Sequence, residues 1–166
     1  MQQSPEDRFD RLYRDHAEAV RAYARRRAPS IAEDVAAETF LVCWRKLDDV
    51  PRQALPWLYA VARNVLANER RRQERLEPAE RIDVAEPALP SDPVLAAAFA
   101  RLSDDDREIL CLVAWEGLGF GDVSAALGCS RVACRVRFHR ARRRLAELLD
   151  GASAASPRPR AEGVTR

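Results

Sequence analysis

The side chains best suited to chemistry on a charged partner lie in the run RVACRVRFHRARRR, residues 131 to 144, which holds seven arginines and no acid. Guanidinium groups donate paired hydrogen bonds to phosphates and to the edges of guanine bases. An isolated arginine cluster is also typical of a solvated surface. The sequence around the run decides between these interpretations.

Apolar residues inside the run recur at helical spacing, so they predict which face of a helix is buried. They are Cys134, Phe138, Ala141, Leu145 and Leu148. The opposite face is then exposed and includes two valines, which is unusual for a merely solvated surface. Contacts to nucleic acid are therefore expected from Arg131, Val132, Arg135, Val136, His139, Arg140, Arg143 and Arg144.

A second, shorter helix is predicted just before the basic one. The segment FGDVSAALGCS has amphipathic spacing, Gly128 interrupts it, and Ser130 can cap the helix that follows. A short helix, a glycine turn and a basic helix make a helix-turn-helix. This context favours nucleic-acid binding over a solvated charged face.

Three helices are predicted in the first part of the chain, over residues 5–27, 30–47 and 56–73. Ser30 and Glu33 form an S-x-x-E capping pattern, and Pro56 is placed at a first helical position. In the second helix, Asp34 and Glu38 are four residues apart, so both carboxylates project from one face.

The third helix combines aromatic, amide and cationic side chains that suit unstacked bases. Trp57, Tyr59 and the arginines at 70–72 lie on or near it, although either aromatic residue could instead belong to the core. Asn64 offers a donor and an acceptor to a base edge. Arg63 could equally pair with an acid on a neighbouring helix.

Charge and composition divide the chain into segments. Residues 1–76 and 94–150 carry the helical patterns, with net charges of +3 and +1. Residues 77–93 hold four prolines and five acids and carry a net charge of −4, so they predict a flexible linker. The apolar-poor residues 151–166 predict a disordered tail. The expected fold class is all-α, with two small helical domains joined by the linker.

Neither a cofactor nor a metal site is expected. Cys43, Cys111, Cys129 and Cys134 are interpreted as small buried apolar residues, because they show neither a paired framework nor zinc-ligand spacing. The apolar runs are too short to span a bilayer, so a cytoplasmic protein without a membrane partner is predicted.

The order and separation of several motifs resemble the sigma-70 family of bacterial RNA polymerase sigma factors, in its two-domain extracytoplasmic-function (ECF) group. The resemblance covers roughly residues 6 to 150 and is carried by EDVAAETFLVCW, PWLYAVARNVLANERRR, LSDDDREILCLVAWEGLGFGDVSAALGCS and RVRFHRARRRL.

The resemblance implies a role for each surface and no enzymatic activity of the chain itself. It implies that residues 1–76 form a region 2-like domain that docks on core RNA polymerase and binds the −10 promoter element, and that residues 94–150 form a region 4-like domain that reads the −35 element in promoter DNA. An anti-sigma factor that buries the same surfaces is implied as a further partner. The implied polymerase contacts are Asp34, Glu38, Thr39 and Phe40. The implied −10 contacts are Trp57, Arg63, Asn64, Arg70, Arg71 and Arg72. The basic helix supplies the implied −35 contacts.

Two other classes of protein fit parts of the sequence. A stand-alone helix-turn-helix transcriptional regulator would use the basic helix on duplex DNA but would leave the first 76 residues without a role. A nuclease would use Asp34 and Glu38 as metal ligands. No third ligand is convincingly placed beside them, and His16 and His139 are isolated.

Overall fold

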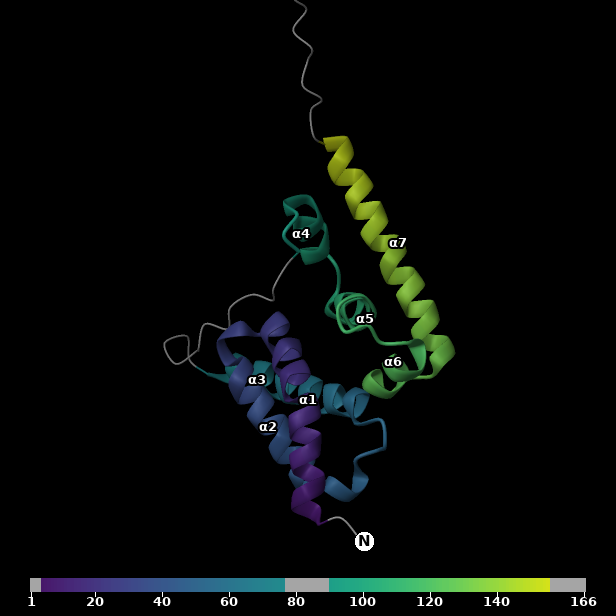
Figure 1. The fold of residues 1–166 in the computed structure, drawn as a ribbon. Helices are drawn as coiled ribbons and strands as arrows, with labels where there is room; N and C mark the ends of the chain where they lie inside the picture. Colours follow the sequence, from purple (N-terminus) through teal and green to yellow (C-terminus); the bar gives the residue numbers. More distant parts are fainter. Residues whose placement is uncertain (1–3, 77–89, 156–166) are drawn as a thin grey trace, which may run out of the picture.

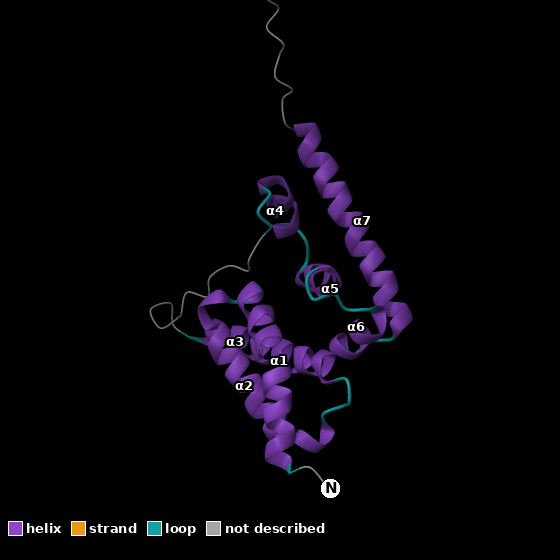
Figure 2. Cartoon of the chain, in the orientation of Figure 1, coloured by secondary structure: helices purple, strands orange, loops and turns teal. Residues whose placement is uncertain are grey.

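The computed structural model describes residues 4–76 and 90–155, with side chains as far as residue 151. Every regular element in these residues is helical, which confirms the all-α prediction (Figure 2). The N-terminal half consists of α1 (Pro5–Arg27), α2 (Ala32–Arg45) and α3 (Ala54–Arg75), with short 3-10 turns at Pro29–Ile31 and Leu47–Asp49. The C-terminal half consists of α4 (Pro93–Ala100), α5 (Asp104–Ala114), α6 (Phe120–Leu127) and α7 (Arg131–Ala155).

Serine and aspartate side chains begin four of these helices. Ser4 caps α1, Asp92 caps α4, Ser103 caps α5 and Ser130 precedes α7, each accepting a hydrogen bond from the backbone N–H three residues on. The cap predicted at Ser130 is confirmed. The caps at Ser103 and Ser130 fix where the acidic α5 and the basic α7 begin.

The predicted start of the second helix is wrong. Its N-cap is Ile31, without a side-chain cap hydrogen bond, because Pro29 begins a separate 3-10 turn that contains Ser30. Glu33 instead pairs with Arg21 of α1, at 3.2 Å. The third helix also begins earlier than predicted, at Ala54, so Pro56 is its third residue.

Apolar side chains of the helices form the core. In the N-terminal half, Val20, Tyr23 and Leu58 are fully buried between α1, α2 and α3. In the C-terminal half, Ile109 and Leu112 of α5 are buried together with residues of α6 and α7. The stripe predicted on α7 is confirmed: Cys134 and Ala141 have no exposed surface, and Phe138, Leu145 and Leu148 are partly buried.

The two halves contact one another through the helices drawn near the centre of Figure 1. Helix α3 packs against α6, and the last turn of α1 meets α5 through polar side chains. The predicted linker lies outside the described residues from 77 to 89, and its last residue, Pro93, begins α4. Residues 151–155, predicted as the start of a disordered tail, continue α7, and residues 156–166 lie outside the described part.

Candidate nucleic-acid interface

The turn between α6 and α7 has the geometry that the sequence predicts for a helix-turn-helix. Gly128 ends α6 in the left-handed region, with φ of 64°, a conformation that glycine adopts without steric cost. Ser130 Oγ then accepts a hydrogen bond from Ala133 N at 3.1 Å in the first turn of α7. The basic helix is therefore held by its buried stripe, with the opposite face outward.

The outward face of α7 carries the predicted combination of apolar and cationic groups. Val132 is 73% exposed and Val136 43%, while Arg131, Arg135, His139 and Arg140 are also exposed. The Arg135 guanidinium lies 5.7 Å from the centre of the Phe120 ring of α6, a cation–π contact that orients it across the turn. This face can offer hydrogen bonds to bases and phosphates and apolar contact to a thymine methyl group.

Two arginines farther along α7 are already paired. Arg143 contacts Glu147 at 3.3 Å on the solvent side. Arg144 donates to Asp106 Oδ2 of α5 at 2.5 Å. Arg144 therefore helps to attach α7 to α5, a role that its position in an arginine run did not reveal.

The helix-turn-helix also contains a disulfide, contrary to the expectation of four unpaired cysteines. Cys129 in the turn and Cys134 in α7 are joined, with their Cα atoms 6.6 Å apart, which is within the usual range for a disulfide. Cys43 and Cys111 remain free and buried, as predicted. The disulfide links the turn to the first turns of the basic helix.

A groove of about 750 Å³ between α2 and α3 brings two sets of predicted site residues together. One wall carries Asp34 and Glu38, and the other carries Trp57, Asn64 and Arg72. The sequence predicted both sets but not that they share one hollow. The prediction also missed Lys46 and Asn68 in the lining, although Asn68 lies midway between Asn64 and Arg72 at helical spacing.

Other predicted −10 contacts lie outside this groove. Arg63 faces the C-terminal half, 3.8 Å from Asp105, and Arg70 lies 3.9 Å from Asp104. The pairing of Arg63 with an acid, which the sequence left open, is thus observed. Arg71 is exposed and donates to the carbonyl of Ala67 and the side chain of Asn68, so it stays along its own helix.

Two of the four predicted polymerase contacts are core residues. Thr39 has no exposed surface, and its hydroxyl donates to the Val35 carbonyl at 2.7 Å. Phe40 is 4% exposed and packs edge-on against Phe9 and Tyr13. Neither side chain can contact a partner in this conformation, because α2 turns both toward α1 and α3.

Asp34 and Glu38 differ from these neighbours because both are exposed at the groove between α2 and α3. Glu38 lies 4.0 Å from Arg45, a surface pair that a partner could replace at little cost. The two carboxylates are therefore available to a cationic surface.

Tyr59 belongs to the core and not to a base-stacking platform. It is 3% exposed and stacks on Tyr23, with ring centres 4.8 Å apart. Burial and the charge of Glu116 raise the pKa of Tyr59 to about 12. Trp57, by contrast, is partly exposed and lines the groove.

Comparison with known proteins connects both surfaces to one family. The family model for sigma-70 region 2 matches residues 12–76, and the model for sigma-70 region 4 matches residues 94–145. The chain belongs to the sigma-70 family. As a sigma factor, it directs promoter-specific transcription by RNA polymerase, which confirms the function that the sequence resemblance implied.

Relatives place this sigma factor in the ECF group. It is 34% identical over 157 residues to RNA polymerase sigma factor CarQ of Myxococcus xanthus, covering 87% of this chain and 90% of CarQ. It is 32% identical over 140 residues to ECF RNA polymerase sigma factor EcfG of Rhodopseudomonas palustris, covering 76% of each chain. The sigma factor RpoE from Bartonella quintana, solved in complex with the anti-sigma factor NepR, superposes with a TM-score of 0.65 at 27% identity, covering 86% of this chain and 96% of RpoE.

Within residues 4–76 and 90–155, no group of three or more His, Cys, Asp or Glu side chains is arranged to hold a metal ion. No helix in this part of the chain is long and apolar enough to cross a membrane.

Proposed function

We propose that this sigma factor divides promoter recognition between its halves, as its sequence predicts. Residues 1–76 would dock on core RNA polymerase and bind the −10 element, residues 77–93 would join the halves, and residues 94–150 would read the −35 element. The observation that carries this proposal is the outward face of α7, where arginines flank two exposed valines on a capped helix-turn-helix. These activities would place the protein in the cytoplasm.

We assign polymerase docking to Asp34 and Glu38. Their exposure on one face of α2 supports this role, because paired carboxylates complement a basic surface. Reversing both charges, D34K/E38K, should weaken binding to core polymerase at least tenfold, roughly the effect of 1.4 kcal/mol, while the helical circular dichroism signal is retained. Asp10 and Asp15 on α1 are also exposed, so D10K/D15K is the charge-matched control. Equal binding by both double variants would contradict the assignment.

We assign the −10 element to the groove between α2 and α3. Trp57 can stack on an unpaired base, Asn64 can hydrogen-bond to a base edge, and Arg72 can contact phosphate. Stacking on an aromatic residue contributes about 1–3 kcal/mol per base. Trp57→Ala in the holoenzyme should therefore reduce promoter opening by about five- to 150-fold, as followed by a fluorescent base analogue at the −10 position.

A matched control for Trp57→Ala is Trp44→Ala, because Trp44 is 42% exposed on α2 and does not line the groove. Equal loss of promoter opening in both variants would point to a general effect on the N-terminal half. Normal opening by the Trp57→Ala holoenzyme would remove Trp57 from the −10 site.

We further propose an anti-sigma factor as a partner, because the related RpoE was solved with one. Such a protein would cover Asp34 and Glu38 and compete with core polymerase. Purification of the tagged chain from its host before and after stress, followed by mass spectrometry, tests this. Recovery of core polymerase alone under every condition would argue against an anti-sigma partner.

A further inference from the structure

Two arginines at the start of α7 break the rules that usually place charges on a helix. Arg131 and Arg135 are four residues apart, so like charges project from one face, which is an unfavourable arrangement. Arg131 also lies in the first turn, where the helix dipole disfavours a cation. Within the described residues no carboxylate pairs with either arginine, whereas Arg143 and Arg144 each bind an acid. The placement of the first two is therefore explained by contacts outside α7.

Helix α6 supplies one contact through an aromatic ring. The Arg135 guanidinium carbon lies 5.7 Å from the centre of the Phe120 ring, within the range of a cation–π contact. Phe120 is itself held by Phe138 of the buried stripe, with ring centres 5.5 Å apart and planes at 70°. The ring supports the guanidinium group without a carboxylate or carbonyl acceptor, so Arg135 keeps its N–H donors for a base edge.

Gly121, the next residue of α6, lies against the other arginine. A β-carbon at position 121 would lie 2.8 Å from Arg131 Nη2 and 3.6 Å from its guanidinium carbon, so any side chain here would displace that group. The backbone itself does not need glycine at this position, because only Gly117 and Gly128 have positive φ among the described residues. The absence of a side chain at position 121 is therefore explained by Arg131 and not by the turn.

The two helices are fixed relative to one another, so these contacts set the direction of both guanidinium groups. Helices α6 and α7 pack side by side, with Val123 and Cys134 fully buried and Ala126 4% exposed (Figure 1). Cys134 is also joined to Cys129 in the turn. An arginine that is held in place before binding loses less side-chain entropy when it contacts DNA.

We propose that Phe120 and Gly121 are positioning residues for −35 recognition. Phe120 supports Arg135, and Gly121 leaves the space that Arg131 occupies. Neither residue needs to contact a base. Together they set where the two guanidinium groups present their donors, and thereby which bases are preferred in the −35 element. This inference rests on the proposed reading of the −35 element by α7.

Gly121→Ala separates positioning from stability. Alanine is a better helix former than glycine, so this variant should retain or raise the melting temperature while it displaces the Arg131 guanidinium group. A bidentate contact between arginine and guanine discriminates against other bases by about five- to 150-fold. Displacement of the group should lower the preference at one base pair by about two- to fivefold, measured by promoter-library transcription with the reconstituted holoenzyme.

Gly151→Ala is the matched control, because it makes the same chemical change in α7 where a β-carbon would have no atom of the described residues within 4 Å. It should leave the base preference unchanged. In an Arg131→Ala background, Gly121→Ala should have no further effect on the preference, because the side chain that it displaces is absent. A loss that persists in that background, or an unchanged preference in the single variant, would overturn the role of Gly121.

Phe120→Leu keeps an apolar contact with Phe138 but removes the aromatic ring. An exposed cation–π contact contributes a factor of about two to five, so binding to the cognate −35 element should weaken by that factor and the preference at the base contacted by Arg135 should relax. Phe120→Tyr retains a ring and should restore both properties. Rescue by tyrosine distinguishes positioning from packing, and equal behaviour of the two variants would overturn the role of Phe120.

The variants Arg131→Ala and Arg135→Ala separate this inference from the proposed function. If both leave the −35 preference unchanged, the assignment of α7 as the −35 reader fails, and the positioning fails with it. If both relax the preference while Gly121→Ala and Phe120→Leu do not, only the positioning fails.

Discussion

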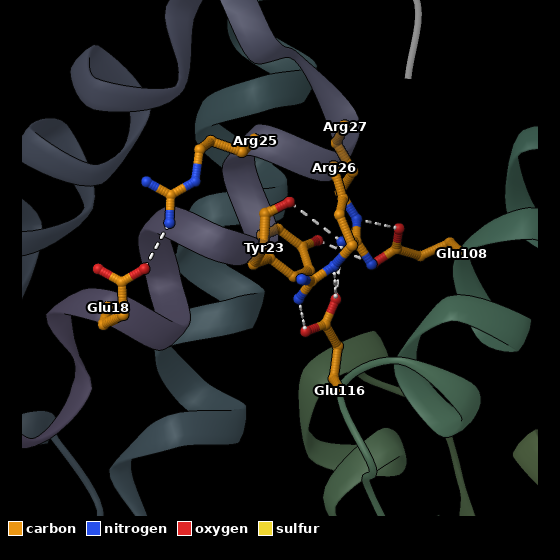
Figure 3. A network of polar contacts seen from close by, with 7 residues as sticks. All are labelled: Glu18, Tyr23, Arg25, Arg26, Arg27, Glu108 and Glu116. Carbon is orange, nitrogen blue, oxygen red and sulfur yellow. Dashed lines mark hydrogen bonds and ion pairs between the residues drawn. The ribbon is translucent and has the colours of Figure 1, made fainter. Parts of the chain in front are cut away.

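Replacing Arg27 with methionine should open the molecule without unfolding either half. Arg27 is 7% exposed and binds Glu108 and Glu116 in the polar network shown in Figure 3, and its guanidinium carbon lies 3.5 Å from the centre of the Tyr23 ring. Methionine can fill much of the apolar volume of the arginine stem but supplies no charge. Glu108 is left with the Tyr23 hydroxyl, and Glu116 with Arg26.

Removing one partner of a buried ion pair typically costs about 3–5 kcal/mol. Separation of the halves relieves this cost, because both glutamates then regain water. The equilibrium between closed and open forms should therefore shift toward the open form by a factor of about 150 to 4,000. The first transition in urea, followed by tryptophan fluorescence, should move to lower concentration, and X-ray scattering should show a larger molecule before any helical signal is lost.

Arg25→Met is the matched control, two positions earlier on α1. Arg25 pairs with Glu18 on the surface, with its side chain 48% exposed, and such pairs contribute about 0–1 kcal/mol. In addition, the loss of closed-state stability in the double variant R27M/E108Q should be smaller than the sum of the losses in the two single variants, because both partners of the ion pair are removed together. If R27M and R25M behave alike in urea and in scattering, the network does not hold the halves together.

Three further predictions concern individual side chains. Arg135→Ala should reduce the free energy of binding to the cognate −35 element by about 1–3 kcal/mol and relax the sequence preference in a promoter-library assay. Arg144→Ala should reduce transcription from all promoters alike. Because it also leaves Asp106 without this partner, Arg144→Ala should lower the melting temperature. Burial raises the pKa of Tyr23 and raises that of Tyr59 to about 12. Above pH 10 these tyrosines therefore lose protons in the unfolded chain before they do so in the folded chain, and the free energy of unfolding should fall. Ultraviolet titration of tyrosinate during unfolding checks this. Cys111, whose pKa burial raises to about 12, should resist iodoacetamide at neutral pH until urea unfolds the chain, as mass spectrometry can follow.

Local signals predicted much of the fold because they act within a few residues. Helix α1 spans Pro5–Arg27, the bounds that the sequence predicts for the first helix. The buried stripe of α7 was also predicted correctly from spacing alone. The start of α2 was predicted wrongly, because a 3-10 turn at Pro29 and the attraction of Glu33 to Arg21 replaced the expected capping pattern.

Assignments that depend on contacts between distant residues could not be made from spacing. Thr39 and Phe40 were grouped with Asp34 and Glu38 by sequence adjacency, but a helix turns adjacent residues by 100° and places these two in the core. The pairing of Cys129 with its partner was missed for a related reason. Cys129 precedes the helix, so helical spacing does not apply to it.

The acidic first turn of α5 shows why a sound local explanation can be incomplete. Asp104, Asp105 and Asp106 suit the positive end of a helix, and that electrostatic benefit explains their presence without any distant partner. Yet Asp106 binds Arg144, and the other two face Arg63 and Arg70 from a different helical half. An exposed carboxylate at a helix N-terminus keeps lone pairs for a second cation, so the two roles do not compete. The same aspartates therefore stabilise the first turn of α5 and pair with arginines of α3 and α7 at the same time.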